Sequence, residues 1–344
     1  MSDFHPRAQV ELDALTFEDP ASAPPPSDRL ESDSVRRAPH IPVMSEETFT
    51  LLAIGPAAVV IDTTVGAGGH AAQALARLGP SGRLFGFDRD EHALELASAR
   101  LGGDPRVALC CARFSELGKA LDERGVRQAD GWMFDLGVSS MQLDEADRGM
   151  SFLRDGPLDL RMDPARGEET AADLVNRMRE EPLANLIYEL GEERASRRIA
   201  RAIVEARRRQ RITRTLQLAQ IVKSAVPFSK ADAGRIHPAT RTFQALRIAV
   251  NHELEELEAG LEIALARLAP GGRVAVLSYH SLEDRIVKVR FRRAAQEGFE
   301  ILTKRPLQAG DAEIAQNPRA RSAKLRALLH PVSRNPRGRE ESGR

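Results

Sequence analysis

Two hydrophobic patterns alternate along the first part of this 344-residue chain. Short apolar runs that end in polar residues predict strands at 57–64, 82–90, 106–114 and 129–140. Between them, apolar residues three and four positions apart predict helices at 70–79, 91–102 and 115–125. A further helix begins near Ser45. This alternation is typical of a doubly wound parallel α/β sheet, which binds its ligands at the carboxyl ends of the strands.

The pattern changes after the fourth predicted strand. Residues 143–236 contain helical and loop signals but no strand, and Thr170 with Asp173 forms a predicted capping box there. One long helix is predicted after Pro238, because a single apolar stripe continues through it. The stripe consists of Phe243, Leu246, Val250, Leu254, Leu257 and Leu261. A fifth strand, "RVAVLSYH", follows the helix, so the sheet resumes after a helical insertion.

These signals divide the chain into four parts. We expect a ligand-binding α/β domain made from residues 39–142 and 237–330, with an all-helical domain, 143–236, inserted in it. Residues 1–38 are acidic and rich in Pro and Ser, and residues 331–344 are basic, so both are predicted to be disordered tails.

Composition narrows the class of protein. Hydrophobic residues make up 42% and charged residues 29% of the chain, which is typical of globular proteins. No apolar run approaches the roughly 20 residues that cross a bilayer, and no signal peptide is visible, so we expect no membrane association. Cys110 and Cys111 are adjacent and the only cysteines, which favours a reduced, cytoplasmic compartment and argues against a zinc site. No metal is expected.

The net charge is zero, yet positive charge is concentrated in the insertion. The segment from Arg194 to Arg214 contains one acid, Glu205. An arginine-rich run can be an ordinary solvated helix face or a contact with phosphate groups. On the second interpretation, the candidate RNA contacts are Arg207, Arg208, Arg209, Arg241 and Arg247.

A glycine-rich loop follows the first predicted strand in "IDTTVGAGGHAAQAL". Gly66, Gly68 and Ala71 fit the spacing of a dinucleotide site, although this motif alone is weak. Three predicted strands end in an acid, namely Asp62, Asp88 and Asp135. Carboxylates there would repel a pyrophosphate and attract an ammonium and a sulfonium, while Asp88 suits ribose hydroxyls. The charges therefore favour S-adenosylmethionine over a dinucleotide.

Longer motifs then identify a family. They include "DTTVGAGGH", "FDLGVSSMQLD", "YELGEERASRRIARAIV", "HPATRTFQALRIAVNHELEELE" and "LAPGGRVAVLSYHSLEDRIVK", in this order between about residues 40 and 330. With these motifs the chain resembles the bacterial 16S ribosomal RNA cytosine-N4-methyltransferases, the RsmH or MraW family. The resemblance implies a class I S-adenosylmethionine-dependent methyltransferase fold, Rossmann-like and doubly wound, with an inserted all-helical domain that recognises RNA.

The resemblance also implies an activity and a set of cofactor contacts. The activity is N4-methylation of cytosine 1402 of the 16S RNA, and the partner is that RNA or the small ribosomal subunit. A homodimer is an open possibility. The cofactor residues carried over by motif are Gly68, Gly69, His70, Asp88, Phe114, Asp135 and Gln142. Among these, Asp88 suits the ribose, Phe114 can pack on adenine and the loop N–H groups can hold the methionine carboxylate.

The catalytic group is less well defined by sequence. Asp135 and His280 are the candidates, with Ser139, Ser140 and Ser278 nearby in the motifs. His280 precedes a predicted capping box, Ser281 to Asp284, so it can belong to a helix start instead. Two other functions stay open: a ribosome-assembly factor that binds S-adenosylmethionine without turnover, and a methyltransferase with a different acceptor.

Overall fold

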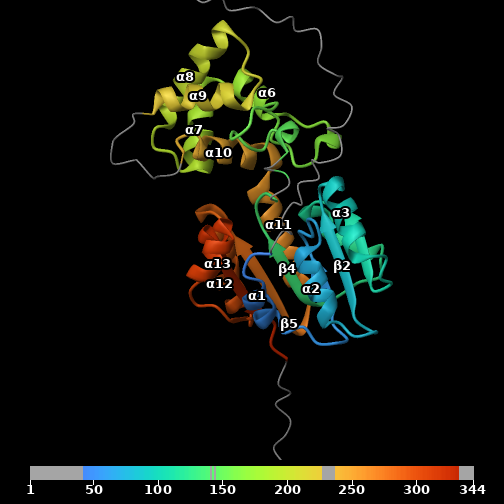
Figure 1. The fold of residues 1–344 in the computed structure, drawn as a ribbon. Coiled ribbons are helices and arrows are strands. Elements are labelled where there is room, and N and C mark those ends of the chain that lie inside the picture. Colours follow the sequence, from blue (N-terminus) through green and yellow to red (C-terminus); the bar gives the residue numbers. More distant parts are fainter. Residues whose placement is uncertain (1–41, 140–141, 143–144, 227–236, 333–344) are drawn as a thin grey trace, which may run out of the picture. The chain divides into compact units, whose positions relative to one another are not determined.

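The computed structural model describes residues 42–139, 142, 145–226 and 237–332 (Figure 1). The predicted acidic tail, 1–38, lies outside these residues, as do 227–236 of the insertion and 333–344 of the basic tail.

One sheet of seven strands is present in the described residues, in the order β3-β2-β1-β4-β5-β7-β6. Neighbouring strands from β3 to β5 are parallel, whereas β7 is antiparallel to both β5 and β6. This order and the antiparallel edge are those of a class I methyltransferase, so the predicted fold class is confirmed. The strands are β1 (Val59–Asp62), β2 (Arg83–Asp88), β3 (Val107–Cys111), β4 (Ala129–Asp135), β5 (Leu268–Ser278), β6 (Glu300–Ile301) and β7 (Lys324–Leu329).

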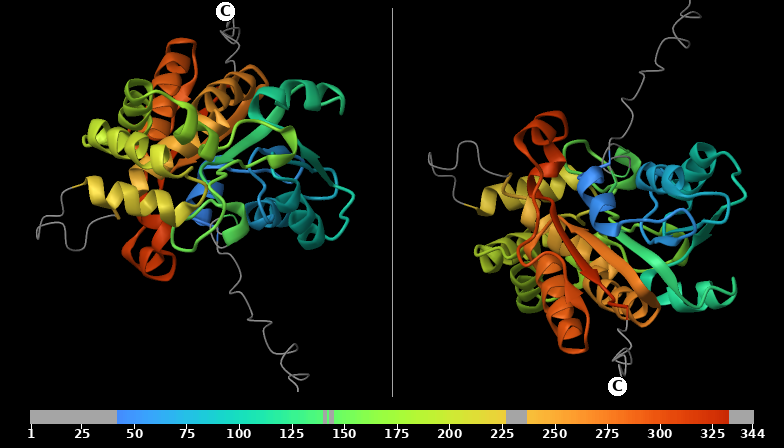
Figure 2. Two further views of the ribbon diagram at one scale, coloured as in Figure 1. Left: turned by 90° about the horizontal axis from the view of Figure 1, so that it is seen from above. Right: turned by 90° about the horizontal axis from the view of Figure 1, so that it is seen from below.

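Helices cover both faces of the sheet (Figure 2). Successive strand residues point to opposite faces, so Ile61 and Trp132 join one apolar cluster while Val60 and Met133 join the other. The first cluster is completed by α4 (Leu117–Asp122), α11 (Glu253–Ala266) and α12 (Ser281–Gln296). The second is completed by α1 (Ser45–Leu52), α2 (Gly69–Arg77) and α3 (Glu91–Leu101). Trp132 is fully buried.

The insertion forms a third apolar cluster. Its helices are α6 (Ala171–Arg177), α7 (Glu180–Gly191), α8 (Ser196–Arg209) and α9 (Thr215–Ala225). The predicted capping box at Thr170 and Asp173 is present at the start of α6. The cluster also includes Phe243, Leu246 and Val250 of α10 (Thr240–Asn251), beyond residue 236, where the sequence placed the end of the insertion.

The single long helix predicted after Pro238 is wrong. Two helices, α10 and α11, are separated by His252, whose φ of 51° lies in the left-handed region. The apolar stripe continues across this break, but its first half packs in the helical cluster and its second half packs on the sheet. A last short helix, α13 (Asp311–Gln316), follows β6. None of the helices in the described residues is long and apolar enough to cross a membrane.

Candidate active site

A cavity of about 440 Å³ lies at the carboxyl ends of the parallel strands. The sheet side contributes the loop after β1, Asp88 at the end of β2 and Asp135 at the end of β4. The helical cluster contributes Met150, Phe152 and Phe243. The cavity is therefore built by both parts of the chain.

The glycine loop is held by short contacts that only glycine allows. Gly66 has a φ of 51° and donates its N–H to Asp88 Oδ2 at 2.9 Å. A Cβ at Gly69 would lie 2.8 Å from Cγ of Pro42. Gly69 and His70 line the cavity, as predicted, whereas Gly68 caps α2 and faces Ala97 of α3 instead.

Asp88 is fixed in the cavity wall. Its Oδ1 accepts the backbone N–H of Asp90 at 3.0 Å, while Oδ2 accepts that of Gly66. Burial raises the pKa of Asp88 to about 6, and these hydrogen bonds limit the rise. Each oxygen keeps a lone pair for a hydroxyl donor, so this carboxylate can bind the two hydroxyls of a ribose.

Asp62 does not face the cavity, so its predicted attraction of the ligand is wrong. Its side chain is fully buried behind the loop, where Oδ1 accepts the Thr64 N–H at 3.1 Å and Oδ2 has no hydrogen-bond partner in the described residues. Burial raises its pKa to about 7, against the opposing effect of His70. The acid acts on its neighbour His70 rather than directly on a ligand.

Asp135 is held from two sides. Its Oδ1 accepts a 2.6 Å hydrogen bond from the Tyr279 hydroxyl, and Oδ2 lies 3.4 Å from His70 Nδ1. His70 Nε2 donates to the carbonyl of Val43 at 3.1 Å. Burial works against the charged imidazole, but Asp135 and Asp62 outweigh it and raise the pKa of His70. Burial and Asp135 together raise the pKa of Tyr279, which keeps its hydroxyl a donor.

Sequence reasoning missed Tyr279 because a tyrosine directly after a strand is also common as core. The only signal was its place at the end of β5, beside the ends of the other parallel strands.

The two remaining cofactor candidates also reach the cavity. Phe114 packs edge-on against Phe134, with ring centroids 5.5 Å apart, and Gly260 of α11 leaves room for it. The Gln142 amide donates to Asp90 at 2.8 Å and accepts the Ser139 N–H at 3.0 Å. Ser139 lines the cavity, Ser140 lies outside the described residues, and Ser278 is buried with its hydroxyl toward Lys324.

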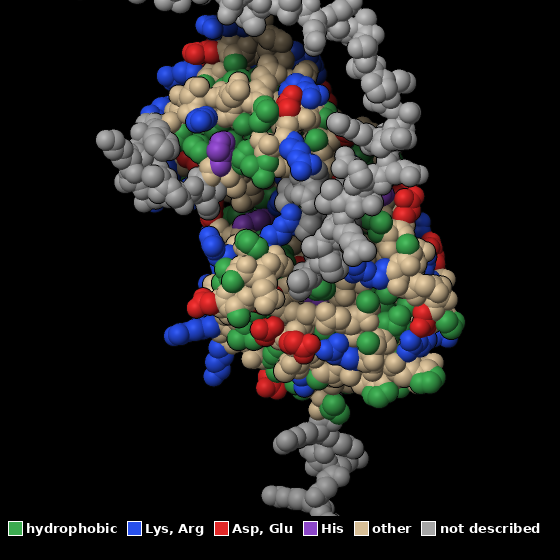
Figure 3. All heavy atoms as spheres, in the orientation of Figure 1, with side chains coloured by type: hydrophobic (Ala, Val, Ile, Leu, Met, Phe, Trp, Pro, Cys, Tyr) green, Lys and Arg blue, Asp and Glu red, His purple; other side chains and the backbone are tan. Residues whose placement is uncertain are grey.

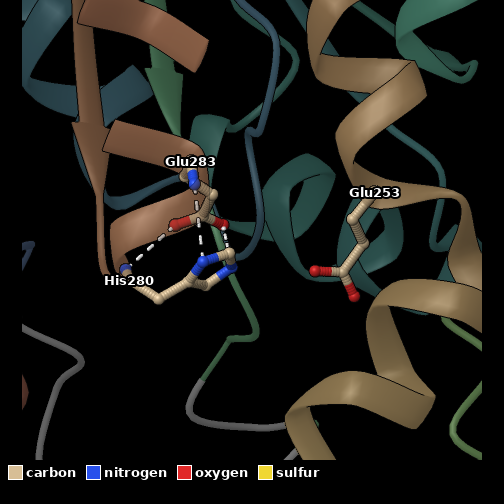
Figure 4. A group of neighbouring side chains, drawn as sticks. All are labelled: Glu253, His280 and Glu283. Atoms are coloured by element: carbon tan, nitrogen blue, oxygen red, sulfur yellow. Dashed lines mark hydrogen bonds and ion pairs between the residues drawn. The ribbon is translucent and has the colours of Figure 1, made fainter. Parts of the chain in front are cut away.

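His280 lines the cavity and at the same time starts α12. The predicted capping box, Ser281 to Asp284, is wrong by one residue: His280 is the cap and Glu283 its partner. His280 Nδ1 accepts the Glu283 N–H at 3.4 Å, so the proton of the neutral ring lies on Nε2. Nε2 lies 3.2 Å from Glu283 Oε1, an ion-pair distance (Figure 4), and has no hydrogen-bond partner among the described residues.

Glu253 completes a small charged cluster across from this pair (Figure 4). The three residues could ligate a cation, since their ligand atoms lie within 4.8 Å of one another. However, both oxygens of Glu253 already accept hydrogen bonds from Arg247 Nε and Nη2, at 2.8 and 2.9 Å. Arg247 therefore supplies the positive charge at this place.

The five predicted RNA-binding arginines differ in their surroundings. Arg247 is in the cavity wall, Arg241 donates to the Glu192 carbonyl at 3.1 Å, and Arg207 donates to the Val175 carbonyl at 2.6 Å. Arg208 and Arg209, at the end of α8, are exposed. Lys and Arg side chains are visible over the helical insertion in the space-filling view (Figure 3).

The residues of the cavity suit S-adenosylmethionine. Asp88 offers acceptors to a ribose, Phe114 offers an aromatic face to a base, and Asp135 supplies a negative charge to an ammonium or sulfonium.

Comparisons with known proteins agree with this assignment. The chain is 53% identical to a ribosomal RNA small subunit methyltransferase H of Geobacter sulfurreducens, over 84% of this chain and 97% of that protein. It is 51% identical to the protein of the same name from Sorangium cellulosum, over 90% of this chain and 94% of the relative. The sequence model of the MraW methylase family matches residues 37–330. The chain therefore belongs to the MraW methylase family.

Proposed function

We propose that this methylase uses S-adenosylmethionine to methylate the N4 amino group of a cytosine, cytosine 1402, in the 16S RNA of the small ribosomal subunit. The main support is the position of Asp135. Its carboxylate lines the cavity together with residues of the glycine loop and of the helical cluster, and Tyr279 and His70 hold it there. The relatives' name, ribosomal RNA small subunit methyltransferase H, supports the RNA as substrate.

A cytosine amino group is a poor nucleophile, because its lone pair is delocalised into the ring. When bound, S-adenosylmethionine supplies a methyl group on a positively charged sulfur. Asp135 can accept a hydrogen bond from the amino group, since each carboxylate oxygen has a second lone pair besides those used by Tyr279 and His70. That contact would direct the nitrogen toward the methyl carbon, and orientation of this kind is worth roughly 7–11 kcal/mol in favourable cases.

His280 would act on the same base as a donor rather than as a proton acceptor. Its Nδ1 is engaged at the start of α12, and Nε2 is buried 3.2 Å from Glu283 Oε1, so the Nε2–H group must turn away from Glu283 to reach a base in the cavity. A cytosine ring presents acceptors at N3 and O2 next to its amino group, and uracil presents a donor at N3 instead. We therefore assign His280 a role in orienting the base.

The target base is paired or stacked in folded RNA and must leave its stack to enter the cavity. The apolar wall formed by Met150, Phe152 and Phe243 offers it a surface to replace that stacking. This part of the cavity comes from the helical cluster, which fits the proposed role of the insertion in RNA recognition.

The experiment is transfer of labelled methyl from S-adenosylmethionine to small subunits from a bacterium that lacks such an enzyme, followed by digestion to nucleosides. We expect label in N4-methylcytidine with the wild-type chain and a loss of at least a hundredfold with Asp135→Ala. Asp311→Ala is the control, because Asp311 is exposed and does not line the cavity. Binding of S-adenosylmethionine without any methyl transfer would instead favour the assembly factor. Label in another nucleoside would favour a methyltransferase with a different acceptor.

A further inference from the structure

A second hollow, of about 530 Å³, lies on the surface of the helical insertion. It is formed where α7 ends and α8 begins. Its polar and aromatic lining consists of Asn185, Tyr188, Glu193, Arg194, Arg197 and Arg198. None of these residues belongs to the cofactor cavity.

Tyr188 is unusually exposed for an aromatic residue. Of its surface, 59% is open to solvent, although its neighbour on the helix, Ile187, is fully buried. The ring therefore contributes little to the core of the insertion. An open aromatic face on a basic surface is the feature on which single-stranded nucleic acids stack their bases.

The three arginines beside it have no acidic partner. Arg194, Arg197 and Arg198 are exposed, and in the described part of the chain none of them makes an ion pair. The acid in the hollow, Glu193, uses its carboxylate to accept the backbone N–H of Ala195 at 2.7 Å. Arg197 and Arg198 also stand in the first turn of α8, where the helix dipole disfavours positive charge. The hollow thus holds three arginines and one acid, and this excess of positive charge fits an anionic ligand.

The hollow is adjacent to the rim of the cofactor cavity. The carbonyl of Leu190, two residues after Tyr188, accepts a 3.2 Å hydrogen bond from Gln244, which lines that cavity. The Glu192 carboxylate accepts hydrogen bonds from Ser281, next to His280, and from Arg285. An RNA strand with one base in the cavity would therefore run past this corner of the insertion.

We propose that this hollow binds a nucleotide of single-stranded RNA that flanks the target base. The base would stack on Tyr188, and the phosphates would contact Arg194, Arg197 and Arg198. This inference rests on the proposed function and adds a binding site to it. The site is distinct from Arg207, Arg208 and Arg209, the candidates named from sequence at the other end of α8.

The test is binding of a single-stranded fragment of the small-subunit RNA around the target cytosine, measured by fluorescence anisotropy at several salt concentrations. Tyr188→Ala is expected to weaken binding about tenfold, whereas Tyr188→Phe keeps the aromatic face and should bind like the wild type. Replacing Arg194, Arg197 and Arg198 with Ala should reduce the slope of log affinity against log salt by about 2, at roughly 0.7 for each phosphate contact.

A second triple variant serves as the charge control. It removes the same charge from exposed positions outside the hollow, through Arg292→Ala, Lys304→Ala and Arg305→Ala. This variant should leave the slope of log affinity against log salt unchanged. Affinity for S-adenosylmethionine and the unfolding midpoint should stay constant in every variant.

Equal RNA affinity in Tyr188→Ala and the wild type would overturn the proposal, as would equal losses in the two triple variants. Because the readout is binding, this result is independent of whether the methyl group reaches cytosine. Failure of the labelling experiment above would count against the proposed function alone.

Discussion

A chain of buried polar residues links the core of the sheet to the cavity. It runs from Asp62 through His70 to Asp135 and ends at Tyr279. His70, Asp135 and Tyr279 line the cavity, whereas Asp62 does not. Asp135 and Asp62 raise the pKa of His70, and His70 Nδ1 lies 3.4 Å from Asp135 Oδ2. Asp62 is therefore a supporting residue whose own burial costs stability when it is ionised.

That cost should appear in the pH dependence of folding. The pKa of Asp62 is about 7 in the folded chain and 3.8 when unperturbed. The folded state thus keeps a proton that the unfolded state releases, and stability from this group falls as the pH rises from about 4 to 7. Asp62→Asn, measured by urea unfolding, should raise the free energy of unfolding by about 1–2 kcal/mol at pH 5 and by about 3–4 kcal/mol at pH 8.

Asp104→Asn is the matched control for that experiment. This exposed carboxylate is paired with Arg106, which lowers its pKa to about 2, so it is charged at both pH values. Its replacement should have the same effect at pH 5 and pH 8. A similar lack of pH dependence for Asp62→Asn would mean that Asp62 is ionised throughout, contrary to this account.

At the level of single residues, sequence identified those whose place follows from topology. Asp88 and Asp135 end parallel strands, and the sheet brings such ends together. Gln142 and Phe114 were found only through the resemblance to a family. Asp62 was misplaced because it pairs with Gly86 and Met133, two residues before Asp88 and Asp135, so it lies deeper in the sheet than those acids, and sequence alone does not give that register. Tyr279 was missed because its hydroxyl partner is 144 residues away.

At the level of elements, the break between α10 and α11 is the main departure from the predicted pattern. The apolar stripe is regular across it, so periodicity predicts a continuous helix. The two halves are directed at different cores, and His252 accommodates the change of direction. Two contacts secure the break: the Arg247–Glu253 pair, and Asn251, whose side chain bonds the backbone of Leu160 and Met162.

The contact between α7 and α10 positions the cavity wall and should be sensitive to added volume. A Cβ at Gly191 would lie 2.5 Å from the backbone carbonyl oxygen of Arg241 and 3.3 Å from Cβ of Ala245. Gly191→Ala must therefore push the two helices apart. We expect a loss of about 1–3 kcal/mol in the free energy of unfolding, together with slower methyl transfer.

Gly118 provides the comparison, because it is also within a helix, α4, and the nearest atom to an added Cβ is 3.8 Å away. Gly118→Ala should be neutral or stabilise the fold by up to about 1 kcal/mol. If urea unfolding gave the two variants the same stability, Gly191 would not be required for the close packing of α7 on α10.

At the level of the whole molecule, the two apolar clusters on the faces of the sheet and the apolar cluster of the insertion all contribute residues to the cofactor cavity. The parallel α/β core as far as β5 and the presence of a helical insertion followed from the alternation of patterns along the sequence, whereas β6 and the antiparallel β7 were not predicted. The sequence did not predict that the helical core extends to Val250, because α10 and α11 share one uninterrupted apolar stripe. Under the proposed function, the sheet would supply the residues for the cofactor and the helical cluster the apolar wall for the acceptor.

The most direct test of this account is the position of the methyl group in the RNA. Small-subunit RNA from a strain that lacks its own enzyme, complemented with this chain, would be cut into fragments and sequenced by mass spectrometry. We predict one added methyl on the base of cytosine 1402, absent with Asp135→Ala and absent when that nucleotide is changed to uridine. A methyl group on the ribose of that nucleotide, or on another nucleotide, would contradict the proposed reaction.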